Sequence, residues 1–288
     1  MKNIFLAITS LCILLISNPV SARQAYPELG IVSGLVQDSI AYAAGFKMIG
    51  ESVPKILSPT LSEDQFQASL KRIKAAKCKV LSCNLFFPGS LKIAGPDVDE
   101  AKVLSYTETV LSRAKLAGVK YIVLGSSGAR SIPAGYNLDK AKADFVILCK
   151  KLGQVAKKND VVILLENLET TETNFITSLK AAAEIVKKVH EPNFRLNVDI
   201  FHMLREGESP DEIIAAAKQV GFCEIAEKEK RSLPGVAGDD FRPYLKALKK
   251  INYKGHIFIE ASTNNAAVEM PQAFKYLTKQ IEEVYSVK

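Results

Sequence analysis

The sequence predicts a single-domain (β/α)8 TIM barrel. Short β-rich apolar runs alternate with long amphipathic segments along most of the chain, which is the pattern of parallel strand–helix units. Eight such units fit a chain of 288 residues, and barrels of this type take about 250 residues. A doubly wound open sheet is the alternative, but the units carry no glycine-rich dinucleotide fingerprint. We therefore favour the closed barrel.

The predicted strands and helices alternate in order along the chain. The strands are expected at residues 29–33, 46–51, 79–84, 121–125, 161–166, 194–199, 222–226 and 256–260. The helices are expected at residues 37–44, 62–77, 99–117, 138–158, 174–189, 210–219, 240–250 and 267–285. Start signals support two of them, since Ser62 precedes two acids and Ser209 precedes Pro210.

The first residues have the order of a secretory signal peptide. Lys2 precedes an apolar run from Ile4 to Ile16, and a small-x-small pattern ends at Ala22. The run is too short to span a membrane, which takes roughly 20 apolar residues. We therefore expect residues 1–22 to be removed and residues 23–288 to form the barrel domain. The mature protein is expected to be exported, periplasmic or secreted, with no membrane anchor.

Composition narrows the class further. The formal net charge is +7, but the lysines recur at helical spacings typical of solvated outer faces, so nucleic-acid binding is not expected. The cysteines after the leader lie in apolar segments, which favours core packing over a disulfide framework. They are Cys78, Cys83, Cys149 and Cys223.

Polar residues fall at the carboxyl ends of the predicted strands, where barrels of this kind carry their functional groups. They are Glu51, Asn84, Glu166, Asp199, Glu224 and Glu260. Strand alternation puts Glu166 on the same face as Leu164, and Glu260 on the same face as Phe258. Because like charges that converge on one cavity repel, a bound divalent metal ion is the economical explanation for four such acids.

Several segments resemble the xylose-isomerase-like barrels, a family that includes ketose 3-epimerases. The resemblance covers nearly all of residues 23–288, and its pieces occur in the family's order. They are residues 84–89, 125–130, 165–168 with 172–175, 199–203, 225–227 with 231–235, and 255–260. The distant endonuclease IV group shares the fold, but its zinc cluster needs many histidines and this chain has three.

The resemblance implies a sugar isomerase or epimerase with a small carbohydrate as its partner. It makes Glu166, Asp199 and Glu260 metal ligands, with Glu166 and Glu260 also transferring the proton through a metal-stabilised enediolate. His202 and Arg231 are implied as substrate contacts. Asn84, Glu51 and Arg130, at the strand ends or in the loops that follow, are further candidates for substrate binding. Self-association into a homo-oligomer is compatible with this assignment.

The chain departs from the family at the seventh strand. Glu224 occupies the position where the family usually has a histidine ligand. A site built only from oxygen ligands favours hard cations, so Mn²⁺ or Mg²⁺ is expected before Zn²⁺ or Co²⁺. The extra negative charge also weakens Lewis acidity and raises the pKa values of neighbouring carboxyls.

Two other functions use the same architecture. A keto-sugar lyase or dehydratase needs the same metal and base but expels a substituent instead of returning the proton. A non-catalytic sugar-binding barrel is the alternative from another class. Product analysis separates the two enzymes, and metal analysis separates an enzyme from a binding protein.

Overall fold

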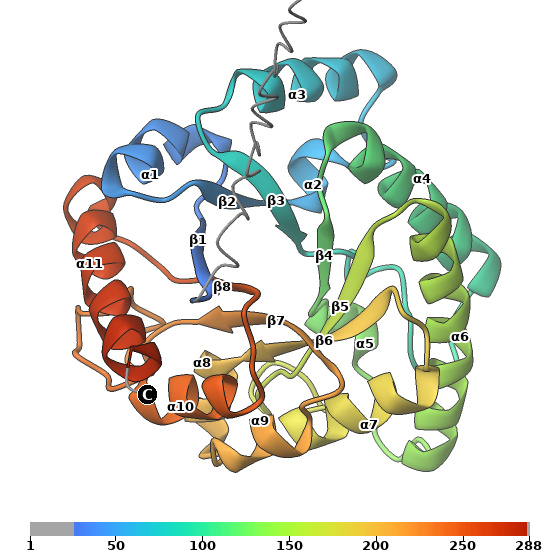
Figure 1. Ribbon diagram of the computed structural model, residues 1–288. Helices are drawn as coiled ribbons and strands as arrows, with labels where there is room; N and C mark the ends of the chain where they lie inside the picture. The colour runs from blue at the N-terminus through green and yellow to red at the C-terminus, as the bar shows by residue number, and fades with distance from the viewer. Residues whose placement is uncertain (1–25, 287–288) are drawn as a thin grey trace, which may run out of the picture.

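Eight parallel strands pair in sequence order and close on themselves, with β1 hydrogen-bonded to both β2 and β8. This is the arrangement in the computed structural model, which describes residues 26–286. Figure 1 shows the strands as a central ring with the helices around it. The expected (β/α)8 barrel is therefore confirmed, whereas the expected signal peptide, residues 1–22, lies outside the described residues.

The strands match their predicted positions to within two residues at either end. They are β1 (Glu28–Val32), β2 (Met48–Ser52), β3 (Lys79–Asn84), β4 (Tyr121–Leu124), β5 (Val162–Glu166), β6 (Phe194–Asp199), β7 (Val220–Ile225) and β8 (His256–Ile259). The pattern succeeds because parallel strands that are covered on both faces must be apolar nearly throughout.

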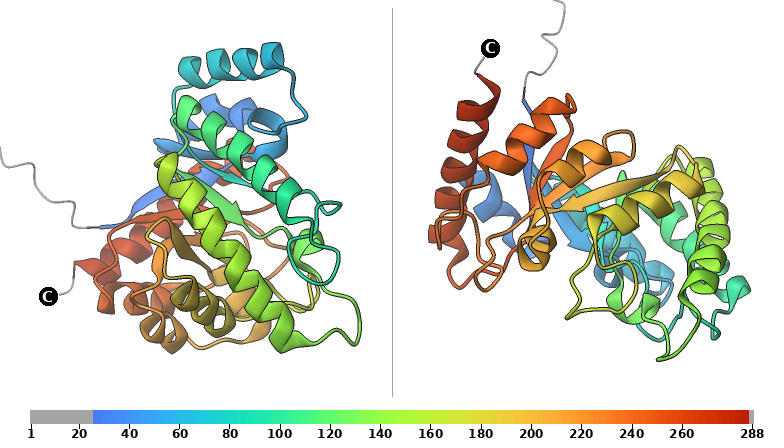
Figure 2. Two further views of the ribbon diagram at one scale, coloured as in Figure 1. Left: turned by 90° about the vertical axis from the view of Figure 1, so that its right-hand side faces the viewer. Right: turned by 90° about the horizontal axis from the view of Figure 1, so that it is seen from below.

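The main helices lie outside the ring, and Figure 2 shows α4 and α6 side by side. The helices and the 3-10 turn η1 are η1 (Leu35–Gln37), α1 (Asp38–Ala44), α2 (Val53–Ile56), α3 (Glu63–Ala75), α4 (Glu100–Ala117), α5 (Ser127–Arg130), α6 (Leu138–Lys158), α7 (Leu179–Val189), α8 (Ile200–Glu206), α9 (Asp211–Ala215), α10 (Arg242–Lys250) and α11 (Ala266–Tyr285). Within residues 26–286, no helix is both long and apolar enough to cross a membrane.

Local signals explain where some of these helices begin. Ser62 and Gln65 form a capping box at the start of α3, as the sequence indicated. Helix α7 begins later than expected, because Ser178 caps it and Asn174 is bound to the backbone of Ile132 in another loop. The short helices α2, α5 and α8 were not predicted, since single turns carry little periodicity.

The barrel interior contains a small apolar layer of its own, separate from the core between strands and helices. Its buried members are Met48, Leu81, Val123, Leu164, Phe222 and Phe258. Three of them stand two residues before an acid in the same strand or at its end, so each shares a face with that acid. The layer closes the barrel below the acids. The four cysteines expected in the core are buried and unbridged.

Close packing inside the barrel makes Gly30 sensitive to substitution. Gly30 pairs with Phe258 across β1 and β8, and an added Cβ would lie 2.3 Å from the Phe258 ring. We expect Gly30→Ala to lower the free energy of unfolding by about 1–3 kcal/mol, the usual cost of overpacking. Urea unfolding measures this. Gly89→Ala is the control, since its Cβ would meet nothing nearer than 3.8 Å; equal losses in both variants would contradict the packing argument.

Candidate functional site

Four carboxylates meet at the carboxyl ends of consecutive strands. Glu166 and Asp199 are the last residues of β5 and β6, Glu224 lies one residue before the end of β7, and Glu260 follows β8. One oxygen from each lies within 4.8 Å of the others. The structure therefore brings together all four residues that were expected to bind a metal.

Burial makes this cluster electrostatically costly. Burial raises the pKa of Glu166 to about 7, although His202 opposes the rise and the charge of Glu260 adds to it. Burial and then the charges of Glu260 and Glu166 raise the pKa of Glu224 well above its usual range. Burial also raises the pKa of Glu260, against the effect of Arg231. At neutral pH the cluster therefore needs protons or a cation.

Two buried asparagines hold the acids in place. Asn84 donates its side-chain amide to Glu224 at 3.0 Å and to Glu260 at 2.5 Å. Asn197 donates to the other oxygen of Glu224 at 2.5 Å. Asn84 was expected as a substrate contact and does line the cavity. Asn197 was not anticipated, although its place two residues before Asp199 puts both on one face of β6.

His202 joins the cluster from the first turn of α8. Asp199 caps this helix by accepting from the backbone nitrogen of His202 at 3.1 Å. The ring nitrogen Nε2 lies 3.6 Å from Glu166 and 3.8 Å from Asp199. Burial lowers the pKa of His202, but the two carboxylates outweigh it and raise the pKa to about 9. The fully buried ring thus faces the acids, and its expected contact with substrate stays a prediction.

Arg231 supplies positive charge at the open side of the cluster. Its guanidinium donates to the carboxylate and to the backbone oxygen of Glu260, and lies 3.7 Å from Asp199. It also lies 3.6 Å from Glu172, an acid not predicted as a site residue, and stacks over the Phe201 ring at 4.6 Å. Burial lowers the pKa of Arg231, but the surrounding carboxylates raise it further, so the guanidinium stays charged.

Two expected substrate contacts occupy other places. Glu51 accepts from the backbone nitrogens of Leu35 and Ser52, and thereby ties the first loop to β2. Arg130 is fully buried and donates to the backbone oxygens of Glu166 and Ile176. Neither is among the residues that line the cavity over the carboxylates, and their geometry fits a structural role; the expected substrate contacts stay predictions. Arg130 acts on the site indirectly, by fixing the end of β5.

The carboxylates open into a cavity of about 440 Å³ with chemically distinct walls. The polar wall consists of Asn84, Glu166, Glu172, His202, Arg231 and Glu260. The apolar wall consists of Pro54, Leu85, Phe87, Pro88 and Leu168, and Gly89 with residues 125–128 completes the lining. The cavity thus presents charged and amide groups on one side and apolar side chains on the other.

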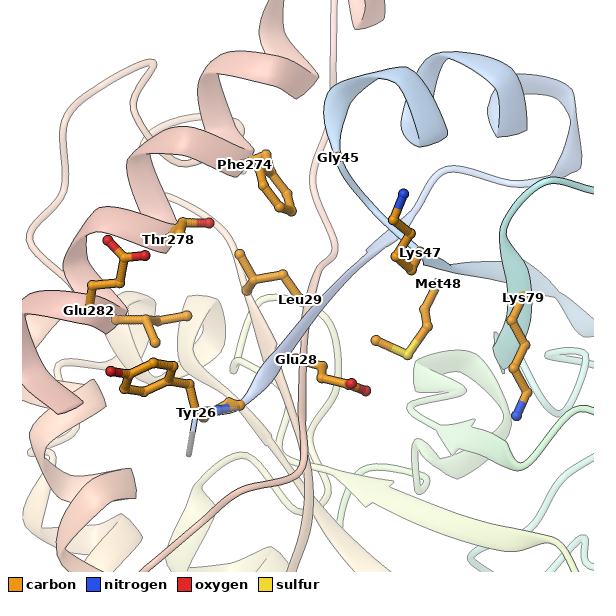
Figure 3. Close-up of a pocket in the computed structure, with 12 residues that line it drawn as sticks. Tyr26, Glu28, Leu29, Gly45, Lys47, Met48, Lys79, Phe274, Thr278 and Glu282 are labelled. Carbon is orange, nitrogen blue, oxygen red and sulfur yellow. The ribbon is translucent and has the colours of Figure 1, made fainter. Parts of the chain in front are cut away.

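A second cavity lies at the other end of the barrel, where β1 to β3 begin (Figure 3). Its volume, also about 440 Å³, does not distinguish it from the first cavity. Its chemistry does, because its charged side chains are exposed and none of its described lining residues belongs to the carboxylate cluster. These charged residues are Glu28, Lys47, Lys79 and Glu282. We therefore place the functional site at the carboxyl-terminal mouth.

The donor set fits a divalent cation. Four carboxylates from four strands present oxygen atoms to one point, and oxygen is the ligand that Mg²⁺ and Mn²⁺ prefer. The Oδ2 atom of Asp199 is buried and accepts no hydrogen bond within the described residues. Its nearest charged neighbours are the Arg231 guanidinium at 3.7 Å and the His202 ring at 3.8 Å, so the oxygen still has the capacity to coordinate a cation.

Comparison with known proteins agrees with the fold. Residues 39–280 match the xylose isomerase-like TIM barrel, and the chain belongs to that family. The L-ribulose 3-epimerase of Methylomonas sp. (strain DH-1) is 29% identical over 152 residues, which is 52% of this chain and 51% of that protein. The hydroxypyruvate isomerase of Escherichia coli (strain K12) is 24% identical over 131 residues, 44% of this chain and 51% of that protein.

The chain thus spans about half the length of these two curated relatives. A solved structure gives a longer match. The D-allulose 3-epimerase of Methylomonas sp. in complex with D-allulose has a TM-score of 0.76 at 18% identity. The match covers 88% of this chain and 97% of that one, and shows that the two share the fold.

The raised pKa of Glu166 predicts how stability depends on pH in metal-free protein. A carboxyl whose pKa is higher in the folded state favours folding when it is protonated. The free energy of unfolding should therefore decrease as the pH rises from about 4.5, the usual pKa of a glutamate, to about 7, the pKa of Glu166 in the folded state. We expect urea unfolding in a chelator to show lower stability at pH 8 than at pH 5, and a smaller decline in Glu166→Gln. Adding Mn²⁺ at pH 8 should restore stability. A decline of equal size in the variant would contradict this assignment.

Proposed function

We propose that the chain is a divalent-metal-dependent isomerase or epimerase that acts on a sugar or keto-sugar. The observation that carries the proposal is the convergence of four carboxylates, three buried and one partly buried, with a histidine and an arginine on one cavity. The named activities of the two curated relatives, epimerisation of L-ribulose and isomerisation of hydroxypyruvate, support a hydroxy-ketone substrate.

Glu166 and Glu260 are the proton-transfer groups. Removing a proton from the hydroxyl-bearing carbon beside a carbonyl gives an enediolate. Returning a proton to the former carbonyl carbon gives the isomer, and returning it to the same carbon from the opposite face gives the epimer. A base works best when its pKa lies near the working pH, and the pKa of Glu166, about 7, meets this condition. Asn84 and Arg231 hold the carboxylate of Glu260 in one orientation. His202 and Arg231 are placed to donate hydrogen bonds to substrate oxygens.

A cation bound by Glu166, Asp199, Glu224 and Glu260 would supply positive charge beside the carbonyl and hydroxyl oxygens of the substrate. Glu224 determines which ion this is. Both of its oxygens are fixed by amide donors, which keeps the carboxylate at the cluster. An all-oxygen set favours Mn²⁺ or Mg²⁺ over Zn²⁺ or Co²⁺.

Substitution of either base tests the mechanism. General acid–base groups contribute on the order of 10²–10⁴-fold to rate, so Glu166→Gln or Glu260→Gln should lower kcat at least about 100-fold. Both variants should still unfold cooperatively in urea, which shows that they remain folded. Glu108→Gln, on the exposed face of α4, is the control. Wild-type rates in both site variants would overturn the two-carboxylate mechanism.

Product analysis by NMR in deuterated water separates the proposed reaction from elimination. An intact sugar carrying solvent deuterium is the result expected for proton transfer by Glu166 and Glu260. An unsaturated product with a released substituent would instead identify a keto-sugar lyase acting at the same carboxylates.

We also propose that the enzyme works outside the cytoplasm. The support is the sequence of residues 1–22, with its early lysine, apolar run and small residues before Arg23. Intact mass and N-terminal sequencing of protein from the extracytoplasmic fraction should give a chain that begins at Arg23. A chain that keeps residues 1–22 and stays in the cytoplasmic fraction would contradict the proposal.

A further inference from the structure

The loop between β7 and α10 contains a second buried acid that takes no part in the carboxylate cluster. Glu227 follows β7 and is fully buried. Among the described residues, no cationic side chain forms an ion pair with it. It is also not one of the residues that line the cavity. A buried carboxylate is costly unless hydrogen bonds compensate for lost water, so its donors show what it does.

Those donors all belong to the loop that follows. One oxygen of Glu227 accepts from the backbone nitrogens of Gly235 at 2.6 Å, Gly238 at 2.9 Å and Asp239 at 3.3 Å. The other accepts from the Ser232 hydroxyl at 3.0 Å and from the backbone nitrogen of Ala237. Charge-assisted bonds of this kind are the strong ones. The part of the loop from Ser232 to Asp239 therefore folds back around the Glu227 carboxylate and is held closed by these hydrogen bonds.

Arg231 belongs to this loop and directly precedes Ser232 in the sequence. Both Lys230 and Arg231 have left-handed backbones, with φ of 56° and 50°, which residues with a Cβ rarely adopt. Such conformations persist only where the surroundings impose them. The Arg231 carbonyl accepts from Ser262 at 2.8 Å, and Glu227 donates its backbone nitrogen to Ser232 at 3.0 Å. The turn that carries Arg231 is thus held on both sides.

We propose that Glu227 is a positioning residue: by closing the loop, its carboxylate aims the Arg231 guanidinium at Glu260 and Glu172. The inference rests on the proposed function of the cluster, because it makes the placement of the cluster's positive charge depend on an acid outside it. Glu227 touches neither substrate nor cation. Its effect reaches the site through Ser232 and the left-handed turn at Arg231.

Hydrogen exchange tests the first step. In Glu227→Gln, the four backbone nitrogens that bind Glu227 face an amide that accepts less strongly and carries hydrogens of its own; they belong to Gly235, Ala237, Gly238 and Asp239. Exchange in a peptide covering these residues should become at least about tenfold faster, while peptides from the barrel strands keep wild-type rates. Glu229→Gln, an exposed acid in the same loop, is the matched control and should change nothing.

Chemical modification tests the second step. Phenylglyoxal, mapped by mass spectrometry, should modify Arg231 several-fold faster in Glu227→Gln than in wild type, while Arg72 on the surface reacts equally in both. If Glu227→Gln does not fold, Ser232→Ala removes one donor and should shift both readouts in the same direction by less. Unchanged exchange in residues 235–239, or an unchanged rate at Arg231, would overturn the proposal.

Metal binding links Glu227 to the site. Mn²⁺ affinity, measured by calorimetry, should change in Glu227→Gln but not when the same substitution is added to Arg231→Met. Additive effects would show that Glu227 acts independently of Arg231 and would overturn its positioning role. If wild type binds no Mn²⁺, the proposed metal site is wrong, whereas exchange and Arg231 modification still decide whether Glu227 positions the loop.

Discussion

Mutual repulsion among Glu166, Asp199, Glu224 and Glu260 is the constraint on which the site depends. The four acids end consecutive strands, and ring closure forces strand ends to converge. Four charges in a desolvated mouth would destabilise the barrel unless protons, hydrogen-bond donors or a cation offset them. Asn84, Asn197, His202 and Arg231 provide hydrogen-bond donors or positive charge at the cluster. This is why a site for a positive ion follows from the fold and the acids together.

Different groups of residues offset the repulsion among the four carboxylates in different ways. Beneath the acids, the apolar layer that includes Leu164, Phe222 and Phe258 excludes water and strengthens each electrostatic interaction. The amides of Asn84 and Asn197 hold Glu224 without adding charge. Arg231 adds one positive charge at the open side, where a substrate enters. The cluster is therefore shielded below and stays accessible above.

Much of this architecture was predictable because the barrel repeats one simple rule. Apolar runs located β3 and β6 at their observed bounds, and the strand-end rule located all four acids. Glu51 shows what the same rule leaves open, because this strand-end acid turns back to the backbone nitrogens of Leu35 and Ser52. Sequence position alone does not distinguish these orientations.

Other features depend on contacts between distant segments and were beyond sequence reasoning. Arg130 stands in a loop of glycine and serine, which resembles an anion site, yet its partners are backbone oxygens 36 and 46 residues away. Glu227 was visible as part of a motif, but its five donors come together only when the loop closes. Asn197 could have been predicted as a site residue, because alternation along β6 places it on the same face as Asp199, two residues earlier.

The most direct test of this account is a calorimetric titration of wild type and Glu224→His with Mg²⁺, Mn²⁺ and Zn²⁺. If the four carboxylates form the metal site, wild type binds one ion per chain and prefers Mn²⁺ or Mg²⁺. The Glu224→His variant loses one negative charge and gains a nitrogen ligand, so its affinity for Zn²⁺ should increase relative to its affinity for Mg²⁺. Unchanged affinity and selectivity, or no binding by either protein, would contradict the account.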